Sequence, residues 1–177
     1  MEHDPLRTRL PDPEKYTVKN LNYCTLNPKT ISDGDFLLSP HKILWNYWQD
    51  LRGDSDIAVY DQIDPMEFNR AIGFVLLLEP NQEASDFRYR VYGSSVAERF
   101  GQEMTGKWLS DFGDAPGKLS LAQYPIILAN RIAVYSEHDA VTEMEFHLTR
   151  WCRLILPMQN RNGTVDRILV GAIPVEL

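Results

Sequence analysis

Residues 88–112 have the sequence RYRVYGSSVAERFGQEMTGKWLSDF, which changes from a strand pattern to a helix pattern within a few positions. Tyr89 and Val91 alternate with arginines, and this period of two is typical of a strand with one buried face. The apolar run GFVLLLE at 73–79 precedes it, separated by the polar connector PNQEAS. The two runs therefore predict an antiparallel hairpin.

A short helix is expected directly after this strand. In SSVAERFG, Ser95 and Glu98 have the spacing of a capping box, and Gly101 can end the helix in a left-handed conformation. The segment MTGKWLSDF then supplies a further turn that carries Trp108. The stretch 88–112 is thus predicted to form a strand, a capped helix and a turn.

Two helices are predicted before the hairpin. Ser39 can cap the first one, Pro40 suits its first position, and Gly53 can end it. Its apolar stripe consists of Leu44, Tyr47, Trp48 and Leu51, with Trp45 beside it. Such a stripe needs an apolar surface to cover. The second helix begins in DPMEFNRAIG, where Asp64 and Glu67 have capping-box spacing.

The C-terminal half predicts one long helix followed by three strands. Over residues 117–136, Leu121, Tyr124, Leu128, Ile132 and Tyr135 have helical spacing, and Pro125 places the helix mostly after Tyr124. The strands are expected at TEMEFHL (142–148), RWCRLILPM (150–158) and DRILVGAIPVE (166–176). Asn162-Gly163 between the last two is a strong signal for a tight hairpin.

Composition and length favour one globular domain. The chain has 177 residues, of which 44% are hydrophobic. Residues 1–38 contain several prolines and no countable period, so they are predicted to be a tail or loosely packed arm, and residues 39–177 the domain. The net charge of -7 argues against nucleic acid as a partner. Two cysteines and the lack of a long apolar run predict a soluble cytoplasmic protein without a disulfide framework or a membrane span.

The order of these elements, two strands, helices and three strands, resembles a bacterial single-domain PAS-like family. The resemblance rests on WNYWQDLRG, DPMEF, FRYRVYGSSV, GQEMTGKWLSDF and CRLILPM in this order, and it covers about residues 39–177. It implies an α+β fold with a five-stranded antiparallel sheet in the order 2-1-5-4-3. Helices would cover one face and enclose a small cavity, with the N-terminal helices flanking the sheet. Such domains are usually sensory or regulatory and bind a small molecule or a protein partner.

A ligand site is predicted at the mouth and walls of this cavity. Five rings with polar tips or large apolar bodies are expected near the mouth: Tyr89, Tyr92, Trp108, Phe112 and Tyr124. With the resemblance, Leu128, Phe146 and Leu156 would point toward the helical layer beside Tyr89. The alternative is that these rings fill the core and leave no room for a ligand.

The sequence contains no catalytic constellation and no metal-binding motif. The four histidines form no His-Glu-x-x-His array, and Glu137, His138 and Asp139 fall at the end of the predicted long helix, where a solvated turn is the simpler interpretation. Segment 117–136 contains no histidine for haem, and SSVAERFG has no cysteine for a flavin adduct. Haem and flavin are therefore disfavoured, and no cofactor is expected beyond an unidentified small organic ligand.

Three hypotheses follow for the function. The first is a non-catalytic sensory or regulatory domain acting in signal transduction. The second is an interaction module that forms a homodimer through the stripe Leu44, Trp45, Tyr47, Trp48 and Leu51, which would otherwise be an exposed apolar patch. The third is an unrecognised enzyme, which would require His147 to be buried beside a carboxylate in the cavity.

Overall fold

The computed structural model describes residues 18–112, 115–141 and 148–176. Its centre is one sheet with the strand order β1-β5-β6-β7-β3-β4, in which the short β2 pairs with β6 in parallel. The strands are β1 (Lys19–Leu26), β2 (Ala58–Tyr60), β3 (Val75–Pro80), β4 (Phe87–Tyr92), β5 (Ala133–Val141), β6 (Leu148–Asn160) and β7 (Val165–Glu176). All pairs except β2–β6 are antiparallel.

The predicted α+β fold is confirmed, and the order 2-1-5-4-3 is confirmed for the five strands β3 to β7. The first and second predicted strands are β3 and β4, and the remaining three are β5, β6 and β7. The expectation of only five strands is wrong, because β1 and β2 raise the number to seven. The edge of the sheet beyond β5 is accordingly occupied by β1.

The N-terminal part of the chain is more ordered than the sequence indicated. Residues 19–26 form β1, which pairs with β5 along most of its length. Asp139 on β5 accepts hydrogen bonds from Asn20 (2.8 Å) on β1 and Arg150 on β6. The apolar side chains of β1 give only a short alternation, Leu21 and Tyr23 between Asn20 and Asn22, which is a weak signal in a segment rich in polar residues. The interpretation of residues 1–38 as a tail is therefore wrong for 19–26, and residues 1–17 lie outside the described part.

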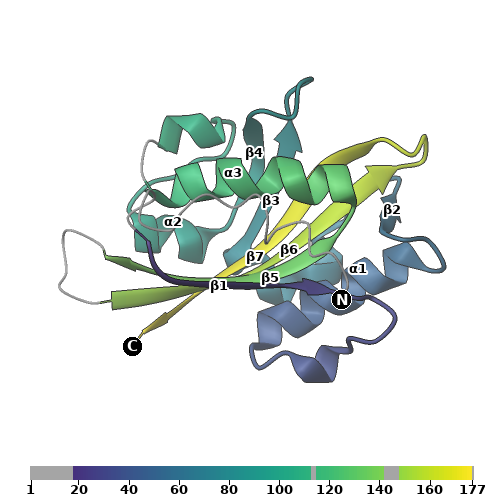
Figure 1. The fold of residues 1–177 in the computed structure, drawn as a ribbon, viewed down its shortest axis with the longest axis horizontal. Coiled ribbons are helices and arrows are strands. Elements are labelled where there is room, and N and C mark those ends of the chain that lie inside the picture. The colour runs from purple at the N-terminus through teal and green to yellow at the C-terminus, as the bar shows by residue number, and fades with distance from the viewer. Residues whose placement is uncertain (1–17, 113–114, 142–147, 177) are drawn as a thin grey trace.

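Helices cover both faces of the sheet (Figure 1). α2 (Ser94–Phe100) and α3 (Ala115–Asn130) lie on one face, with the short helix η4 (Leu109–Phe112). α1 (Ser39–Arg52) lies on the other face, together with η3 (Pro65–Phe74). A further short helix, η2 (Asp33–Asp35), precedes α1. The sheet thus separates two hydrophobic cores, one under α3 and one under α1.

Local signals identified several helix ends. Gly101 ends α2 in the left-handed region at φ 69°, and the Asp64 side chain accepts a hydrogen bond from the Met66 backbone N–H (2.9 Å) at the start of η3. α1 begins and ends where expected, at Ser39 and before Gly53. The predicted capping by Ser39 and Ser95 is not observed, because Leu38 and Gly93 occupy the cap positions.

The boundary between α3 and β5 differs from the prediction. α3 ends at Asn130 and contains Pro125 in its interior, and β5 begins at Ala133. The helical spacing of apolar residues that extends to Tyr135 in the sequence is a coincidence, since Tyr135 belongs to a strand. The strand expected at 142–148 therefore begins earlier, and residues 142–147 lie outside the described part. The predicted solvated turn at 137–139 is wrong, because these residues belong to β5 and both His138 and Asp139 are buried.

The apolar stripe of α1 packs against the sheet of its own chain. Leu44, Trp45, Tyr47 and Trp48 are all buried in the core under α1, and Trp48 Nε1 donates a hydrogen bond to the Pro157 carbonyl oxygen (2.8 Å). The stripe is therefore not the exposed patch that the dimer hypothesis requires. Leu51, its fifth member, is half-buried and packs against the same core.

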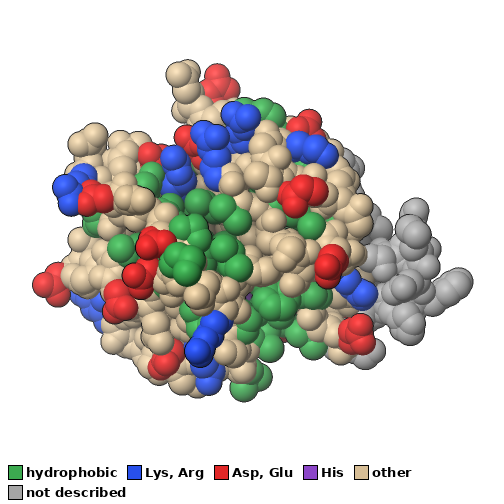
Figure 2. All heavy atoms as spheres, turned by 180° about the vertical axis from the view of Figure 1, so that it is seen from behind, with side chains coloured by type: hydrophobic (Ala, Val, Ile, Leu, Met, Phe, Trp, Pro, Cys, Tyr) green, Lys and Arg blue, Asp and Glu red, His purple; other side chains and the backbone are tan. Residues whose placement is uncertain are grey.

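The surface carries mixed charges. On the face turned away from the viewer in Figure 1, Lys and Arg side chains are interspersed with Asp and Glu, and hydrophobic side chains reach the surface between them (Figure 2).

Candidate functional site

A small cavity lies between α3 and the sheet. Its volume is about 40 Å³, and since one buried water needs about 10–15 Å³ of such space, it has room for about three water molecules. The sheet, α2, η4 and α3 all contribute to its wall. The lining residues are Leu76, Tyr89, Tyr92, Val96, Phe100, Leu109, Phe112, Gly117, Ser120, Tyr124, His138, Trp151, Arg153 and Ala172.

The pairing of β5, β6 and β7 explains why this position is polar and has space. In register, Ser136 lies opposite Arg153, and His138 lies opposite Trp151. Directly opposed residues on one face of a sheet have Cβ atoms about 4.5–5.5 Å apart, so these four side chains are neighbours. On the other side of β6, Arg153 lies opposite Ala172. The small side chains of Ser136 and Ala172 beside the long arginine leave room that larger residues would fill.

Arg153 is the central polar residue of the cavity. Only 5% of its surface is exposed, and its guanidinium donates hydrogen bonds to Ser120 Oγ (3.1 Å), Gln123 Oε1 (2.6 Å) and Ser136 Oγ (3.0 Å). Nε has no hydrogen-bond partner. The three acceptors are neutral, and among the described residues no Asp or Glu lines the cavity. Arg153 is thus a buried cation held in place by two elements but not neutralised by either.

Burial has a direct electrostatic consequence for this side chain. It lowers the pKa of Arg153, while the nearby Tyr124 and Tyr89 act in the opposite direction. An arginine nevertheless stays charged at neutral pH, because its ordinary pKa is above about 12. An unpaired buried ion costs several kcal/mol relative to the ion in water. The cavity therefore contains a positive charge that a bound anion would stabilise.

His138 is the second buried titratable group of the cavity. It is 1% exposed, and neither Nδ1 nor Nε2 has a hydrogen-bond partner. Burial lowers the pKa of His138 to about 3, the charge of Arg153 acts in the same direction, and Asp139 opposes them. The imidazole is consequently neutral at pH 7, with one N–H donor and one acceptor nitrogen available.

Two further buried donors lie in the same region. Trp151 Nε1 and Gln123 Nε2 are both without a hydrogen-bond partner, although Trp151 is only 2% exposed and Gln123 is fully buried. The Trp151 ring stacks on Phe100, with centroids 4.6 Å apart and planes 9° apart, so its indole N–H has a fixed direction. Buried polar groups are almost always paired in proteins or with ordered water. Several unpaired donors around one cavity therefore indicate a place that another molecule fills.

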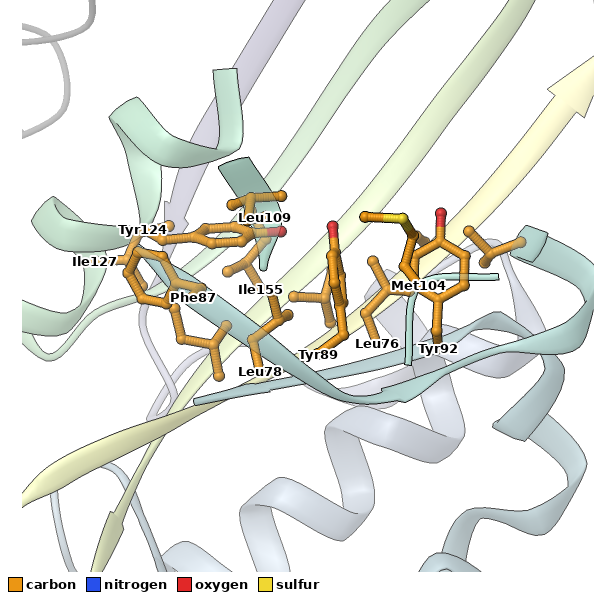
Figure 3. Close-up of a cluster of buried hydrophobic side chains, with 14 of the residues drawn as sticks. Leu76, Leu78, Phe87, Tyr89, Tyr92, Met104, Leu109, Tyr124, Ile127 and Ile155 are labelled. Atoms are coloured by element: carbon orange, nitrogen blue, oxygen red, sulfur yellow. The ribbon is translucent and has the colours of Figure 1, made fainter. Parts of the chain in front are cut away.

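Tyrosines form the wall toward β4 and α3. The rings of Tyr89 and Tyr92 are in edge contact, with centroids 4.9 Å apart. Their hydroxyl ends point away from the sheet toward the helical layer, and the Tyr124 hydroxyl points from α3 toward Tyr89 (Figure 3). All three tyrosines line the cavity, and each is buried.

The residues predicted from the sequence are only partly brought together. Tyr89, Tyr92, Phe112 and Tyr124 line the cavity, which places them at the predicted site without testing whether they bind a ligand. The other four lie elsewhere or outside the described part. Trp108 is 37% exposed, Leu128 is buried in the same core but away from the lining, Phe146 is not described, and Leu156 belongs to the core under α1.

The prediction that Leu156 faces the cavity under α3 is wrong, because its side chain lies on the other face of β6. On β6, Trp151, Arg153 and Ile155 face α3, so Leu154 and Leu156 face α1. His147 also lies outside the described residues, so the enzyme hypothesis keeps its status as a hypothesis.

Sequence reasoning missed the polar residues that define this site. In the sequence Arg153 is one residue of the apolar run RWCRLILPM, and His138 lies in the segment for which a turn is predicted. Within residues 151–158 Arg153 is the single charged residue, and a charge inside such an apolar run was the available signal for it. The argument that no pocket histidine exists holds for the helix but not for the sheet, because His138 reaches the cavity from β5.

Metal and membrane signals are absent from the described residues. Within 18–112, 115–141 and 148–176, no three His, Cys, Asp or Glu side chains gather closely enough to hold a metal ion. No helix in these segments is long and apolar enough to cross a membrane.

Comparison with known proteins gives one family assignment. A family model described as a PAS domain matches residues 38–173, which is more than three quarters of the chain. Comparison with curated proteins and with solved structures gave no match. The matched segment begins at α1 and ends within β7, so it includes every element that lines the cavity.

Proposed function

Because the chain belongs to the PAS domain family, we propose that it is a sensory or regulatory domain whose cavity between α3 and the sheet binds a small molecule. The observation that carries this proposal is the set of buried polar groups without partners around the cavity. Arg153 Nε, Trp151 Nε1 and both ring nitrogens of His138 all belong to residues that line it. Leaving a buried donor unpaired costs about 1–3 kcal/mol, and a ligand that accepts these hydrogen bonds offsets that cost.

Strand β6 contacts both the cavity and the core under α1, so a change in β6 on ligand binding would reach α1. Its alternating side chains face both cores: Trp151 and Arg153 line the cavity, while Leu154 and Leu156 pack under α1. A ligand that binds one arrangement of this strand more tightly than another shifts the population between the two. The proposed output is a change in α1 on the opposite face of the sheet.

The proposal concerns a small organic ligand and no large cofactor. A cavity of about 40 Å³ is far below the roughly 300–1,000 Å³ of pockets that hold drug-sized ligands and cofactors. Haem and flavin therefore do not form part of it. The proposal also assigns no catalytic step to the cavity, since binding alone satisfies its unpaired groups.

The experiment combines native mass spectrometry of the purified full chain with a thermal-shift screen of small metabolites. A co-purified molecule, or a rise in melting temperature with at least one compound, is the expected result. If neither is found for the wild-type protein, the proposed function is wrong.

Two matched variants locate the binding. Ala172→Leu adds atoms to the cavity wall, whereas Ala133→Leu adds the same atoms on the face under α1. Each insertion into a packed core costs about 1–3 kcal/mol, so both variants are destabilised to a similar degree. Only Ala172→Leu should lose the response to ligand. Equal responses in both variants would place the binding outside the cavity and contradict the proposal.

A further inference from the structure

We infer that the ligand of this cavity is a small monocarboxylate, an organic acid of about two to four carbon atoms in total, whose carboxylate binds Arg153 and Trp151. This inference rests on the proposed function, because it names the chemical class of ligand for the same cavity. It depends on three independent properties of the site: its donors, its charge and its size.

The unpaired polar atoms of the site are almost all donors. Among the residues that line the cavity, Arg153 Nε and Trp151 Nε1 can only donate, and the neutral His138 supplies one donor and one acceptor. An ionised carboxylate is the matching group, because it only accepts hydrogen bonds and has two oxygens with about four acceptor positions. An alcohol or amide would bring donors of its own and leave fewer acceptors for the same protein atoms.

The charge of the site favours one negative charge. Arg153 is the cation of the cavity, its three hydrogen-bond acceptors are neutral, and no acidic residue lines the cavity among those described. His138 is neutral, since burial lowers its pKa to about 3. A monocarboxylate neutralises the guanidinium, and hydrogen bonds between ions of opposite charge are about twice as strong as neutral ones. A dianionic phosphate would instead leave one buried negative charge uncompensated.

The size and lining of the cavity define the rest of the ligand. Space for about three water molecules fits a carboxylate with a short body. Beyond the polar groups, the wall is apolar, with Leu76, Val96, Leu109 and Ala172. The part of the ligand that follows the carboxylate is therefore a short hydrocarbon chain without further charge.

The test uses named probes on the full-length chain. Sodium acetate, propionate and butyrate are titrated against acetamide, propionamide and butyramide, which have the same shape but no charge, with sodium chloride keeping the ionic strength constant. Inorganic phosphate is a further arm. The readout is the indole N–H signal of Trp151 in proton–nitrogen NMR spectra, assigned among the four tryptophans by its loss in Trp151→Phe.

The expected result is that at least one carboxylate shifts the Trp151 signal and binds about ten- to a hundredfold more tightly than its amide. Arg153→Met should abolish this preference. Arg150→Met is the matched control, because Arg150 lies on the opposite face of the same strand and is bound to Asp139. Trp151→Phe keeps the stacked ring and removes only one donor, so calorimetry should find carboxylate binding weakened about tenfold in a variant with little change in packing.

The outcomes separate this inference from the proposed function. If amides bind as tightly as carboxylates and Ala172→Leu removes both, the cavity binds ligands but the inference is wrong. If phosphate binds more tightly than every carboxylate, the inference is also wrong. If carboxylates bind equally well to wild type, Arg153→Met and Ala172→Leu, the binding is on the surface and contradicts the inference. If no probe and no metabolite binds, the inference and the proposed function fail together.

Discussion

Replacing His138 with leucine should change how the free energy of unfolding depends on pH. His138 is 1% exposed, and burial lowers its pKa to about 3, against 6.5 for an exposed histidine. Below pH 6.5 the unfolded chain therefore binds a proton that the folded chain excludes. The stability of the folded state must fall as the pH decreases from 6.5 toward 3, and above 6.5 this residue has no effect on the pH dependence.

The magnitude follows from the two pKa values. The limiting slope is about 1.4 kcal/mol per pH unit, and between pH 7.5 and pH 5 His138 alone should remove about 2 kcal/mol of stability. His138→Leu keeps an apolar side chain of similar size and removes the titrating ring. At pH 7.5 the variant should be at least as stable as the wild type, because it removes two unpaired buried nitrogen atoms.

Urea unfolding at a series of pH values from 7.5 to 5 measures this directly. The difference between wild type and variant isolates His138, because groups such as the buried His41 are present in both. Ile155→Val is the matched control: it removes one methyl group from the same core, lowers stability by about 1 kcal/mol and should run parallel to the wild type. If the curve of His138→Leu is also parallel to that of the wild type, His138 is not buried as a neutral ring and the reasoning is refuted.

Three further predictions concern the frame that holds the cavity. Trp48→Ala should lower the free energy of unfolding by about 3–5 kcal/mol, because this side chain is buried within its own chain. The sedimentation coefficient of the folded protein should not change, and dissociation of a dimer would contradict this placement of Trp48. Gly93→Ala should prevent normal folding, because the added Cβ would lie 2.3 Å from a backbone oxygen of η3. In Gly101→Ala the added Cβ meets no neighbour, so this variant should lose only about 1 kcal/mol of stability for its positive φ. Equal effects of the two variants on thermal unfolding would contradict this difference. Asp139→Asn should speed hydrogen exchange in β1 selectively, because the Asp139 carboxylate accepts hydrogen bonds from both Asn20 on β1 and Arg150 on β6. Unchanged exchange in β1 would show that backbone pairing with β5 alone holds this strand.

The sequence predicted those parts of the fold whose signals are local. The alternation of Phe87 and Tyr89 with exposed arginines matches β4, and the glycine at 101 ends α2 as expected. The Asn162-Gly163 turn joins β6 to β7, with Gly163 at φ 80°. In each case the residue that makes the signal also has the conformation or the burial that the signal requires.

Features that depend on distant contacts were not predictable in this way. β1 forms because β5 offers a free edge, and its own alternation of half-buried Leu21 and Tyr23 with exposed Asn20 and Asn22 is too short to predict a strand without that pairing. His138 was assigned to a helix end because apolar residues at helical spacing happen to extend across the boundary at Asn130. In β5 the buried Val134, Ser136 and His138 alternate with the half-buried Tyr135 and Glu137, but serine and histidine give this alternation no hydrophobic signal in the sequence, and it becomes visible only when β5 pairs with β6.

The candidate site shows the same limit. Four of the predicted aromatic residues line the cavity, because their positions follow from the strand and helix patterns. The group that gives the cavity its chemistry, Arg153, was not identified, since its hydrogen bonds join β6 to Ser120 and Gln123, which are 30 or more positions away in the chain. Leu156 was placed on the wrong face because a strand has only two faces and a shift of one residue exchanges them.

A crystal structure of the full chain grown in sodium propionate tests most directly whether the cavity binds a carboxylate. We expect electron density between α3 and the sheet for a bound carboxylate, with an oxygen about 3 Å from the Arg153 guanidinium. Closure of this space by the rings of Tyr89, Tyr92 and Phe112, with Arg153 paired to a carboxylate of its own chain and no density for a ligand, would contradict this expectation.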